Sequence, residues 1–421
     1  MPKYLKNKRR RRHKFIKPSV ETEIKMQSDS EESVRTKKTK TSSLKVLNGK
    51  KQAKQLRRMI FVVVILVITV TLFTVSLLSP TGLKELYGNF SATFSFKNQF
   101  PLELTGTETY SVANVNHYFY LLSDTDISVI SNNGKTSFKD NHGFSNPVLC
   151  KSEARCLIYD QNGKGVKIYN AEESVLNLNM DFSVYSADIA RDGTFAVATK
   201  SDKFTSKVTV FNKKGQFVFE WMCPEETVTS IAVAPNGKSV AVGTVKVSNG
   251  VFSSALYVLK YNSADPVFSK RYDGNFILGI NSDSKKTFTV VFENKCDIIS
   301  WKNYSTLQFE SEYDVNFVQS NKNLTVIASS RENDDGNYKF SIYTNKQKLK
   351  KEFNFSGQVD DFCIKSNKIF ILSGNNVYLI NSDGNIAKKG DCGFGTVKIV
   401  PVSSDSCLAV GHNSITKIAL Q

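Results

Sequence analysis

The sequence predicts an all-β fold of repeated small sheets that follows a single membrane-spanning helix. Three observations lead to this prediction. Residues 59–79 form an uncharged apolar run, a short apolar pattern recurs beyond it, and turn-forming residues flank each copy of that pattern. The first observation concerns the N-terminal part of the chain, and the other two concern residues 93–421.

The N-terminal tail holds most of the excess positive charge. Of the 421 residues, 56 are Lys or Arg and 39 are Asp or Glu, and residues 1–58 contain 20 of the basic residues against 5 of the acidic ones. The rest of the chain is almost neutral. This argues against nucleic-acid binding by the folded body, because such a body would need basic residues clustered on one face. The tail has few apolar residues, so residues 1–58 are predicted to be a disordered cytoplasmic segment.

A block of basic residues lies near the start of this tail. One interpretation is that it contacts anionic lipid headgroups, since a basic residue near a membrane surface contributes about 1 kcal/mol. A second is contact with RNA. A third, which we favour, is that the block only solvates the tail and enforces topology. The candidate lipid contacts are Lys8, Arg9, Arg10, Arg11, Arg12 and Lys14.

Residues 59–79, with the sequence MIFVVVILVITVTLFTVSLLS, are predicted to be a transmembrane signal anchor. As a helix they would reach about 31 Å, enough to cross a hydrocarbon core of about 30 Å. A buried helix of a soluble domain would rarely lack polar residues on every face. A cleaved signal peptide would have a shorter apolar region ending in a small-residue cleavage site, so an uncleaved anchor is favoured.

Basic residues on the N-terminal side of this run predict its orientation, because such residues stay in the cytoplasm. The prediction is a single-pass cell-membrane protein that contacts the lipid bilayer through residues 59–79. A juxtamembrane linker at residues 80–92 leads to an extracytoplasmic domain at residues 93–421. The topology-determining residues are Lys50, Lys51, Lys54, Arg57 and Arg58.

One short pattern returns along the extracytoplasmic part, in the order apolar, any, apolar, apolar, then usually a small polar residue. The spacing between copies averages about 41 residues, which is the length expected of a repeated structural unit. The copies are residues 127–131 (ISVIS), 166–170 (VKIYN), 208–212 (VTVFN), 256–260 (LYVLK), 296–300 (CDIIS), 340–344 (FSIYT), 377–381 (VYLIN) and, in weaker form, 415–419 (ITKIA).

Turn residues surround each copy of the pattern. Upstream lies a predicted hairpin, clearest at 189–197 (IARDGTFAV) and 233–242 (VAPNGKSVAV). Asp192-Gly193 and Asn236-Gly237 supply the positive φ that tight hairpin turns require. Downstream come another turn and a fourth apolar run. Four short strands per unit are typical of a β-propeller blade.

The two ends of the repeat region predict how the ring closes. Residues 396–420 provide three strands, and residues 93–104 (TFSFKNQFPLEL) form a strand-like run ahead of the first full unit. If that run supplies the missing fourth strand, seven complete blades and one composite blade give eight. A ring of seven blades remains the alternative if one weak unit is irregular.

The turn segments IARDGTF and VAPNGKSVAVGT resemble the first hairpin of WD40-like bacterial propeller repeats. The Gly-His and Trp-Asp signatures of true WD40 repeats are absent. The layout of basic tail, signal anchor and divergent propeller is similar to an uncharacterised family of membrane-anchored proteins from Gram-positive bacteria, a domain of unknown function. The resemblance implies a propeller fold and no activity, since propellers carry many unrelated functions.

Candidate chemistry in the sequence is sparse, and we predict no catalytic, metal-binding or cofactor-binding residue and no cofactor. The seven cysteines all lie beyond the apolar run. Cys150 and Cys156 flank KSEAR, and a hairpin there could bring them within reach of a disulfide. The odd number of cysteines favours packing as small apolar residues for most of them.

The favoured function is a non-enzymatic binding or scaffold module for a protein, peptide or envelope polymer. One alternative is an extracytoplasmic hydrolase or lyase with its site in the central funnel, because paired carboxylates from distant repeats leave no local signature. A second alternative is a transmembrane sensor that signals through the basic tail. No nucleic-acid partner is expected for the propeller.

Overall fold

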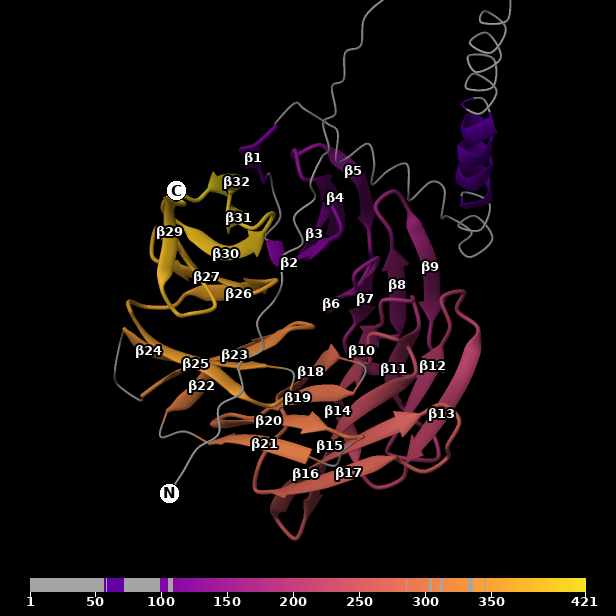
Figure 1. Ribbon diagram of the computed structural model, residues 1–421. Helices are drawn as coiled ribbons and strands as arrows, with labels where there is room; N and C mark the ends of the chain where they lie inside the picture. The colour runs from indigo at the N-terminus through magenta and orange to yellow at the C-terminus, as the bar shows by residue number, and fades with distance from the viewer. Residues whose placement is uncertain are drawn as a thin grey trace, which may run out of the picture. The chain divides into compact units, whose positions relative to one another are not determined.

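The computed structural model of the protein describes residues 57, 59–71, 99–104, 109–284, 286–302, 305–310, 313–331, 336–344 and 346–421 (Figure 1). These residues belong to two separate units, one ending at Thr71 and one beginning at Leu72. Most residues predicted for the tail, for the linker and for residues 72–79 of the anchor lie outside the described ranges. So do Lys8, Arg9, Arg10, Arg11, Arg12, Lys14, Lys50, Lys51, Lys54 and Arg58.

The described part of the first unit is helical. Arg57 and residues 59–71 are in helical conformation, and their side chains are exposed. Within the described ranges, no helix has the length and apolar character needed to cross a membrane.

The second unit consists of eight antiparallel sheets of four strands each. The first four blades are β2 (Thr109–Val115), β3 (Tyr118–Ser123), β4 (Asp126–Ser131) and β5 (Thr136–Asn141); β6 (Pro147–Lys151), β7 (Cys156–Asp160), β8 (Gly165–Tyr169) and β9 (Ser174–Asn179); β10 (Val184–Ile189), β11 (Phe195–Lys200), β12 (Ser206–Phe211) and β13 (Phe217–Cys223); and β14 (Thr227–Val233), β15 (Ser239–Ser248), β16 (Val251–Lys260) and β17 (Phe268–Asp273).

The remaining blades follow the same order. They are β18 (Gly279–Ser284), β19 (Thr287–Val291), β20 (Lys295–Ser300) and β21 (Ser305–Glu310); β22 (Asp314–Ser320), β23 (Leu324–Ser330), β24 (Asn337–Thr344) and β25 (Leu349–Ser356); β26 (Asp361–Lys365), β27 (Lys368–Ser373), β28 (Asn376–Ile380) and β29 (Ile386–Asp391); and β30 (Thr396–Pro401), β31 (Ser406–Gly411), β32 (Ser414–Ala419) and β1 (Leu102–Glu103). The prediction of an eight-bladed β-propeller is therefore confirmed, and the seven-bladed alternative is wrong.

The recurring sequence pattern falls on the third strand of every blade, from β4 to β32. Its apolar positions are buried because each sheet packs on both sides against its neighbours. Val129 in β4 and Ile298 in β20 illustrate this, with 0% and 1% of their surface exposed. The turns behave as predicted too, since Gly193 and Gly237 adopt φ values of 87° and 61°. Their amide N–H groups donate to Ala190 and Ala234 oxygens at 3.0 and 2.8 Å.

The last blade joins the two ends of the propeller sequence. The strand β1 pairs with β32 through Leu102 opposite Ile415 and Glu103 opposite Ser414. The side chains of Leu102 and Leu104 pack against a cluster that includes Phe119 of blade 1 and Val410 of blade 8. The predicted composite blade is thus confirmed, although β1 contains two residues only.

The core consists of apolar clusters between neighbouring blades. Tyr120 of blade 1 and Cys156 of blade 2 share one cluster, and Phe340 of blade 6 and Phe362 of blade 7 share another. Every strand and every described core cluster lies within residues 99–421. Because burial of apolar surface is the main stabilising term, residues 93–421 are expected to fold without the preceding segment.

Candidate functional site

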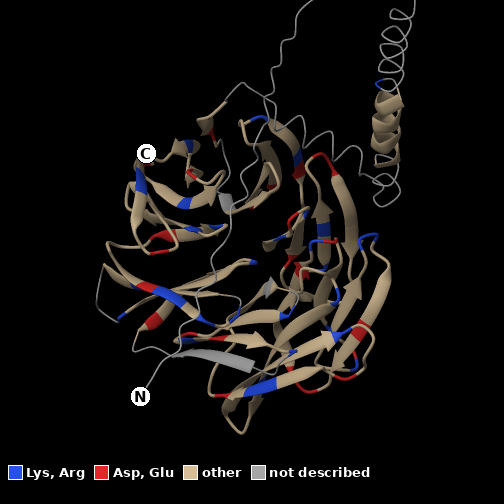
Figure 2. Ribbon diagram, viewed as in Figure 1, with Lys and Arg blue, Asp and Glu red and all other residues tan. Residues whose placement is uncertain are grey.

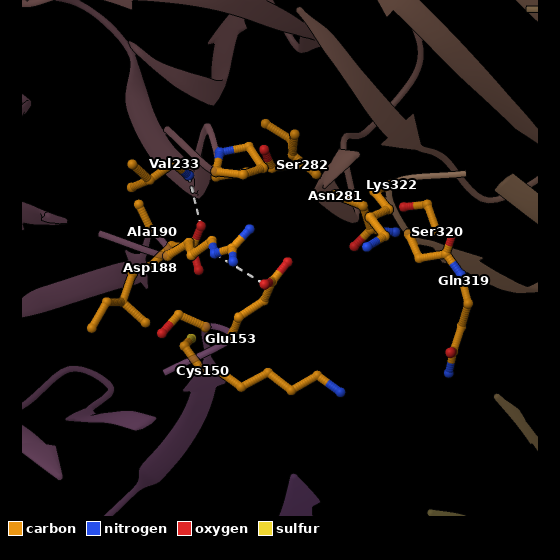
Figure 3. Close-up of a pocket in the computed structure, with 18 of the residues that line it drawn as sticks. Cys150, Glu153, Asp188, Ala190, Val233, Asn281, Ser282, Gln319, Ser320 and Lys322 are labelled. Atoms are coloured by element: carbon orange, nitrogen blue, oxygen red, sulfur yellow. Dashed lines mark hydrogen bonds and ion pairs between the residues drawn. The ribbon is translucent and has the colours of Figure 1, made fainter. Parts of the chain in front are cut away.

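A cavity of about 840 Å³ lies between the innermost strands of the ring, and Figure 3 shows part of its lining. Its walls come from the innermost strand of every blade, which are β2, β6, β10, β14, β18, β22, β26 and β30. The lining residues belong mostly to the ends of these strands and to the turns that follow them, so the cavity lies at one end of the central channel. No single repeat could build it, since each blade contributes only a few residues.

Asp188 is the carboxylic acid in the cavity wall whose pKa is raised to near neutrality. Its Oδ2 accepts a hydrogen bond of 2.6 Å from the Val233 amide of the next blade. Loss of hydration raises the pKa of Asp188 to about 7, and the hydrogen bonds from the Val233 and Ile189 amides offset part of that effect. The carboxyl group therefore joins two blades and holds a proton near neutral pH.

The thiol of Cys150 lies beside Asp188 in the same wall (Figure 3). It donates to the Ala187 oxygen at 3.1 Å, and burial, followed by the nearby Asp188 charge, raises its pKa well above the usual range. A buried thiol with a raised pKa is a poor nucleophile, because the thiolate is the reactive form. Cys150 is therefore suited to packing and not to covalent catalysis.

The disulfide considered between Cys150 and Cys156 is not formed, and both residues are free thiols. Cys156 lies opposite Lys151 in the hairpin, whereas Cys150 lies opposite Leu157. Successive side chains point to opposite faces of a strand, so the two thiols face different neighbours. Cys156 packs in the cluster between blades 1 and 2, and Cys150 packs in the cluster between blades 2 and 3.

All seven cysteines are expected to be reduced in the folded protein. Each is a free thiol, and six of the seven are buried, so oxidants have little access to them. Alkylation of the unreduced, denatured propeller should therefore add seven alkyl groups by mass spectrometry. A product with five alkyl groups would show that one pair is bridged and would contradict the structure.

Other polar side chains on the inner strands connect adjacent blades. The Asn114 amide donates to the Pro401 oxygen at 2.7 Å, which joins blade 1 to blade 8. The Gln319 amide donates to the Phe362 oxygen at 2.7 Å, which joins blades 6 and 7. These groups satisfy buried backbone atoms across the blade boundaries. Their role in the ring is structural.

Two hydroxyl groups of residues in the cavity wall lack a hydrogen-bond partner in the part of the chain that the structure describes. Ser230 Oγ and Ser282 Oγ are shielded from solvent and have no hydrogen-bond partner within the described ranges. They lie on the neighbouring inner strands β14 and β18. Burying a hydroxyl group without a partner is unfavourable, so these two serines cost the inner wall some stability.

Charged residues surround the cavity at the strand ends. Arg191 Nε lies 3.0 Å from Glu153 Oε2 in an exposed ion pair. Lys365 Nζ donates to the Val402 oxygen at 2.6 Å. Loss of hydration lowers the pKa of Lys365, and the like charge of Lys151 adds to this. The charges of Lys365 and Lys151 therefore repel each other at this end of the channel.

The two faces of the propeller carry opposite charge when the charged residues are sorted by the turns in which they lie. Figure 2 marks the charged residues along the ribbon. The basic face is defined as the side of the ring that carries two turns of each blade. These are the turn between the first and second strands and the turn between the third and fourth strands. Basic residues at these turns and strand ends are Lys135, Lys151, Arg155, Arg191, Lys213, Lys214, Lys238, Lys260, Lys286, Lys302, Lys322, Lys346, Lys348, Lys365 and Lys368. Acidic residues there are Glu153, Glu172, Glu173, Asp192, Asp265, Asp383 and Asp405.

The acidic face is the opposite one, where the second strand turns into the third and one blade connects to the next. Its acidic residues are Glu103, Asp124, Asp126, Asp160, Asp181, Asp202, Glu225, Glu226, Asp273, Glu293, Asp314, Asp360, Asp361 and Asp391. Its basic residues are Lys164, Lys200, Lys203, Lys295 and Arg331, and Lys139, Lys246 and Arg271 also reach this face through ion pairs with Asp126, Glu225 and Glu226. The near-neutral net charge of the folded part of the chain is thus the sum of one basic and one acidic face.

The acidic face also carries exposed apolar side chains. The hairpin of β15 and β16 extends beyond its neighbours, since β16 begins to pair with β17 only at Ser253. The hairpin patch is defined as Val247, Val251, Phe252, Phe276 and Leu278, whose exposed fractions run from 41% to 69%. The Gly274 amide donates to the Phe252 oxygen at 3.2 Å, which holds the segment before Phe276 against the hairpin. Clustered exposed apolar groups are typical of protein-binding surfaces.

Sequence reasoning missed both the charge separation and the hairpin patch. A signal for the charge separation was present, because alternate turns of a repeated antiparallel sheet lie on alternate faces. Sorting the lysines by turn would have found the basic face. No cluster of three or more potential metal-binding His, Cys, Asp or Glu side chains occurs in the part of the chain that the structure describes.

Comparisons with known proteins describe the same fold. The model of a family of unknown function, DUF5711, matches residues 92–420. The C-terminal WD40 domain of Sif2 is similar at a TM-score of 0.54 and 10% identity, over 78% of this chain and 100% of that chain. This similarity shows the fold alone.

Two further solved structures are less similar in shape. BamB from Moraxella catarrhalis has a TM-score of 0.48 and 11% identity, over 76% of this chain and 99% of its own. The Dos1 propeller has a TM-score of 0.49 and 14% identity, over 65% of this chain and 77% of its own. A search of curated proteins finds no match.

Proposed function

The chain belongs to DUF5711, a family of unknown function, and from that premise we propose that it is a membrane-anchored, extracytoplasmic propeller that binds a protein partner through its acidic face. The family brings no activity with it, so the proposal depends on the surface of the ring. A non-enzymatic binding role fits a scaffold whose inner polar groups connect blades.

The hairpin patch is the observation that carries this proposal. Val247 and Phe252 are cross-strand neighbours at the tip of the β15–β16 hairpin, and both are more than 40% exposed. Apolar surface in water is unfavourable, and burying it against a partner would release about 25 cal/mol per Å². Asp273 lies near the base of the hairpin, and Glu225 beside it forms an ion pair with Lys246, so the partner surface should be apolar at its centre and polar at its margin.

The anchor and the extracytoplasmic location are supported by the sequence. Residues 59–79 are uncharged, and basic residues crowd their N-terminal side. The positive-inside rule then leaves the ring outside the cytoplasm. Protease added to intact cells should therefore digest the propeller, and protection of the ring from such protease would contradict this part of the proposal.

Photo-crosslinking in intact cells tests the partner. A photo-reactive amino acid at Val251, at the hairpin tip, is expected to give a discrete protein adduct from the full-length chain. The same amino acid at Lys238, on the opposite face of the same blade, serves as the matched position and should not give that adduct. Both residues are exposed, so the reactive group is solvent-accessible at either site.

A second variant separates specific binding from chance contact. Replacing Val247 and Phe252 by serine should abolish the Val251 adduct, because the apolar contact area is lost. Serine at Leu349 and Ile386, which are exposed on outer strands at the basic face, should leave the adduct unchanged. An adduct that survives the Val247 and Phe252 exchange would rule out the hairpin patch as the binding surface.

One observation favours a second candidate, a hydrolase or lyase that works in the central cavity. A carboxyl group with a pKa of about 7, such as that of Asp188, is suited to general acid–base catalysis. Its Oδ2 is, however, engaged by the Val233 amide, which also explains its position structurally. Signalling through the basic tail remains a prediction from the sequence, since that tail lies outside the described residues.

A further inference from the structure

We propose that the basic face of the propeller lies against anionic lipid headgroups, so that the acidic face with its hairpin patch points away from the bilayer. This inference rests on the proposed membrane anchor. It goes beyond that anchor by assigning a second, electrostatic contact to the folded ring and by fixing which face is open to a protein partner.

Exposed lysines lie on this face in blades 1 to 6. Lys135, Lys151, Lys214, Lys238 and Lys286 are exposed and belong to five consecutive blades. Among the described residues, none of these five side chains takes part in an ion pair. A protein epitope would occupy one sector of the ring, whereas an extended anionic plane attracts lysines on many blades at the same time. The distribution therefore fits a membrane surface.

Exposed apolar residues accompany the lysines at the rim of the same face. Phe217, Leu349 and Ile386 are the first residues of the outer strands β13, β25 and β29, and each is at least 50% exposed. Large apolar side chains are thus exposed at equivalent positions of three blades, at the same height on the outer edge of the basic face. Apolar groups inserted between headgroups combine with basic groups in surface-bound membrane proteins. Nucleic acid offers no such apolar layer along its phosphate backbone.

The chain also enters the ring from the basic face. The Gln99 amide donates to the Asn133 oxygen at 2.7 Å, and Asn133 lies in the turn between the third and fourth strands of blade 1. Residues 80–98 separate this point from the apolar run and can extend to about 68 Å at most. If the basic face lies toward the bilayer, the chain can run from the anchor to Gln99 without passing around the edge of the propeller.

The acidic face opposes the reverse orientation. Its carboxylates outnumber its basic residues, so an anionic surface would repel it at distances within about one Debye length, roughly 8 Å at physiological salt. The hairpin patch projects from that face. The two faces together therefore favour one orientation, in which lipid and protein partner occupy opposite sides of the ring.

Vesicle sedimentation with the soluble propeller, residues 93–421, tests the inference directly. The probes are vesicles of phosphatidylcholine alone and vesicles of phosphatidylcholine with phosphatidylglycerol. Binding is expected only to the anionic vesicles and should weaken as salt is raised, since the attraction is screened. This assay contains neither the anchor nor a protein partner, so its failure is distinguishable from failure of the proposed function.

Two matched triple variants identify the face. Lys135→Gln, Lys214→Gln and Lys238→Gln remove three charges from the basic face, whereas Lys164→Gln, Lys200→Gln and Lys203→Gln remove three from the acidic face. All six lysines are exposed, so both variants should fold, which circular dichroism can verify. The first triple should lower the vesicle partition coefficient by at least about tenfold, and the second should change it by less than about twofold.

Three outcomes would overturn the inference. Absence of binding to anionic vesicles would show that the face does not recognise headgroups. Equal losses in the two triples would mean that net charge alone drives the attraction. Stronger binding to single-stranded RNA than to anionic vesicles, lost in the basic-face triple, would assign the face to nucleic acid.

Discussion

Replacing Phe340 by alanine is expected to lower the free energy of unfolding of the propeller by about 3–5 kcal/mol, the usual cost of emptying a large buried aromatic site. Phe340 is completely buried. Its ring stacks on Phe353 with centroids 5.0 Å apart, and it meets the edges of Phe355 and Phe362 at 6.4 and 5.7 Å. The change would remove contacts within blade 6 and between blades 6 and 7.

Urea unfolding followed by far-ultraviolet circular dichroism measures this effect, with tryptophan fluorescence as a second probe. Phe217→Ala is the matched control, because the Phe217 side chain is 64% exposed and its loss should change stability by less than about 0.5 kcal/mol. Similar losses in the two variants would show that the interface between blades 6 and 7 is not packed as described.

Asp188→Asn is expected to stabilise the propeller at pH 8 by about 2–4 kcal/mol and to remove part of its pH dependence. Burial raises the folded-state pKa of Asp188 to about 7 from its usual value of 3.8. Between these pH values the folded state holds a proton that the unfolded state has released. Stability from this group is therefore present at low pH and is lost as pH rises toward 7. Asparagine stays neutral throughout and retains an oxygen that can accept from Val233.

The measurement is the unfolding free energy of both proteins from pH 4 to pH 8. The difference between them should be small near pH 4 and should grow until about pH 7, then stay constant. Asp383→Asn, at an exposed basic-face turn, controls for loss of one negative charge. A variant that is less stable than its parent at pH 8 would show that the Asp188 carboxylate is needed in its charged form.

The sequence predicts the blades well because their third strands carry a local signature. Strands such as β12 and β28 carry closely spaced apolar residues, because neighbouring blades cover both faces of the sheet. Turns such as the one at Gly193 need a residue that tolerates positive φ. The polar inner strand β18, with the sequence GINSDS, has no such signature. Its place in the ring depends on pairing with β19 and on the neighbouring blades.

The candidate sites could not be predicted in the same way, since they combine residues from distant repeats. The pKa of Asp188 depends on an amide 45 residues further along the chain. Cys150 and Cys156 are close in sequence, yet the register of their hairpin turns them toward different clusters. The opposite charge of the two faces is different in kind, because it follows from counting turns once the repeat is known.

The two-residue strand β1 has a mechanical consequence. Any tension carried along the chain ahead of Gln99 reaches the ring at the seam between blades 8 and 1. There it acts on the pairing of Leu102 and Glu103 with β32 and on the Gln99 and Leu104 amides, whose bonds to Asn133 and Asn413 measure 2.7 and 2.8 Å. In every other blade, all four strands are longer than β1 and pair over more residues. Tension from the upstream segment would therefore separate β1 from β32 first and leave the strand pairing of the other seven blades intact.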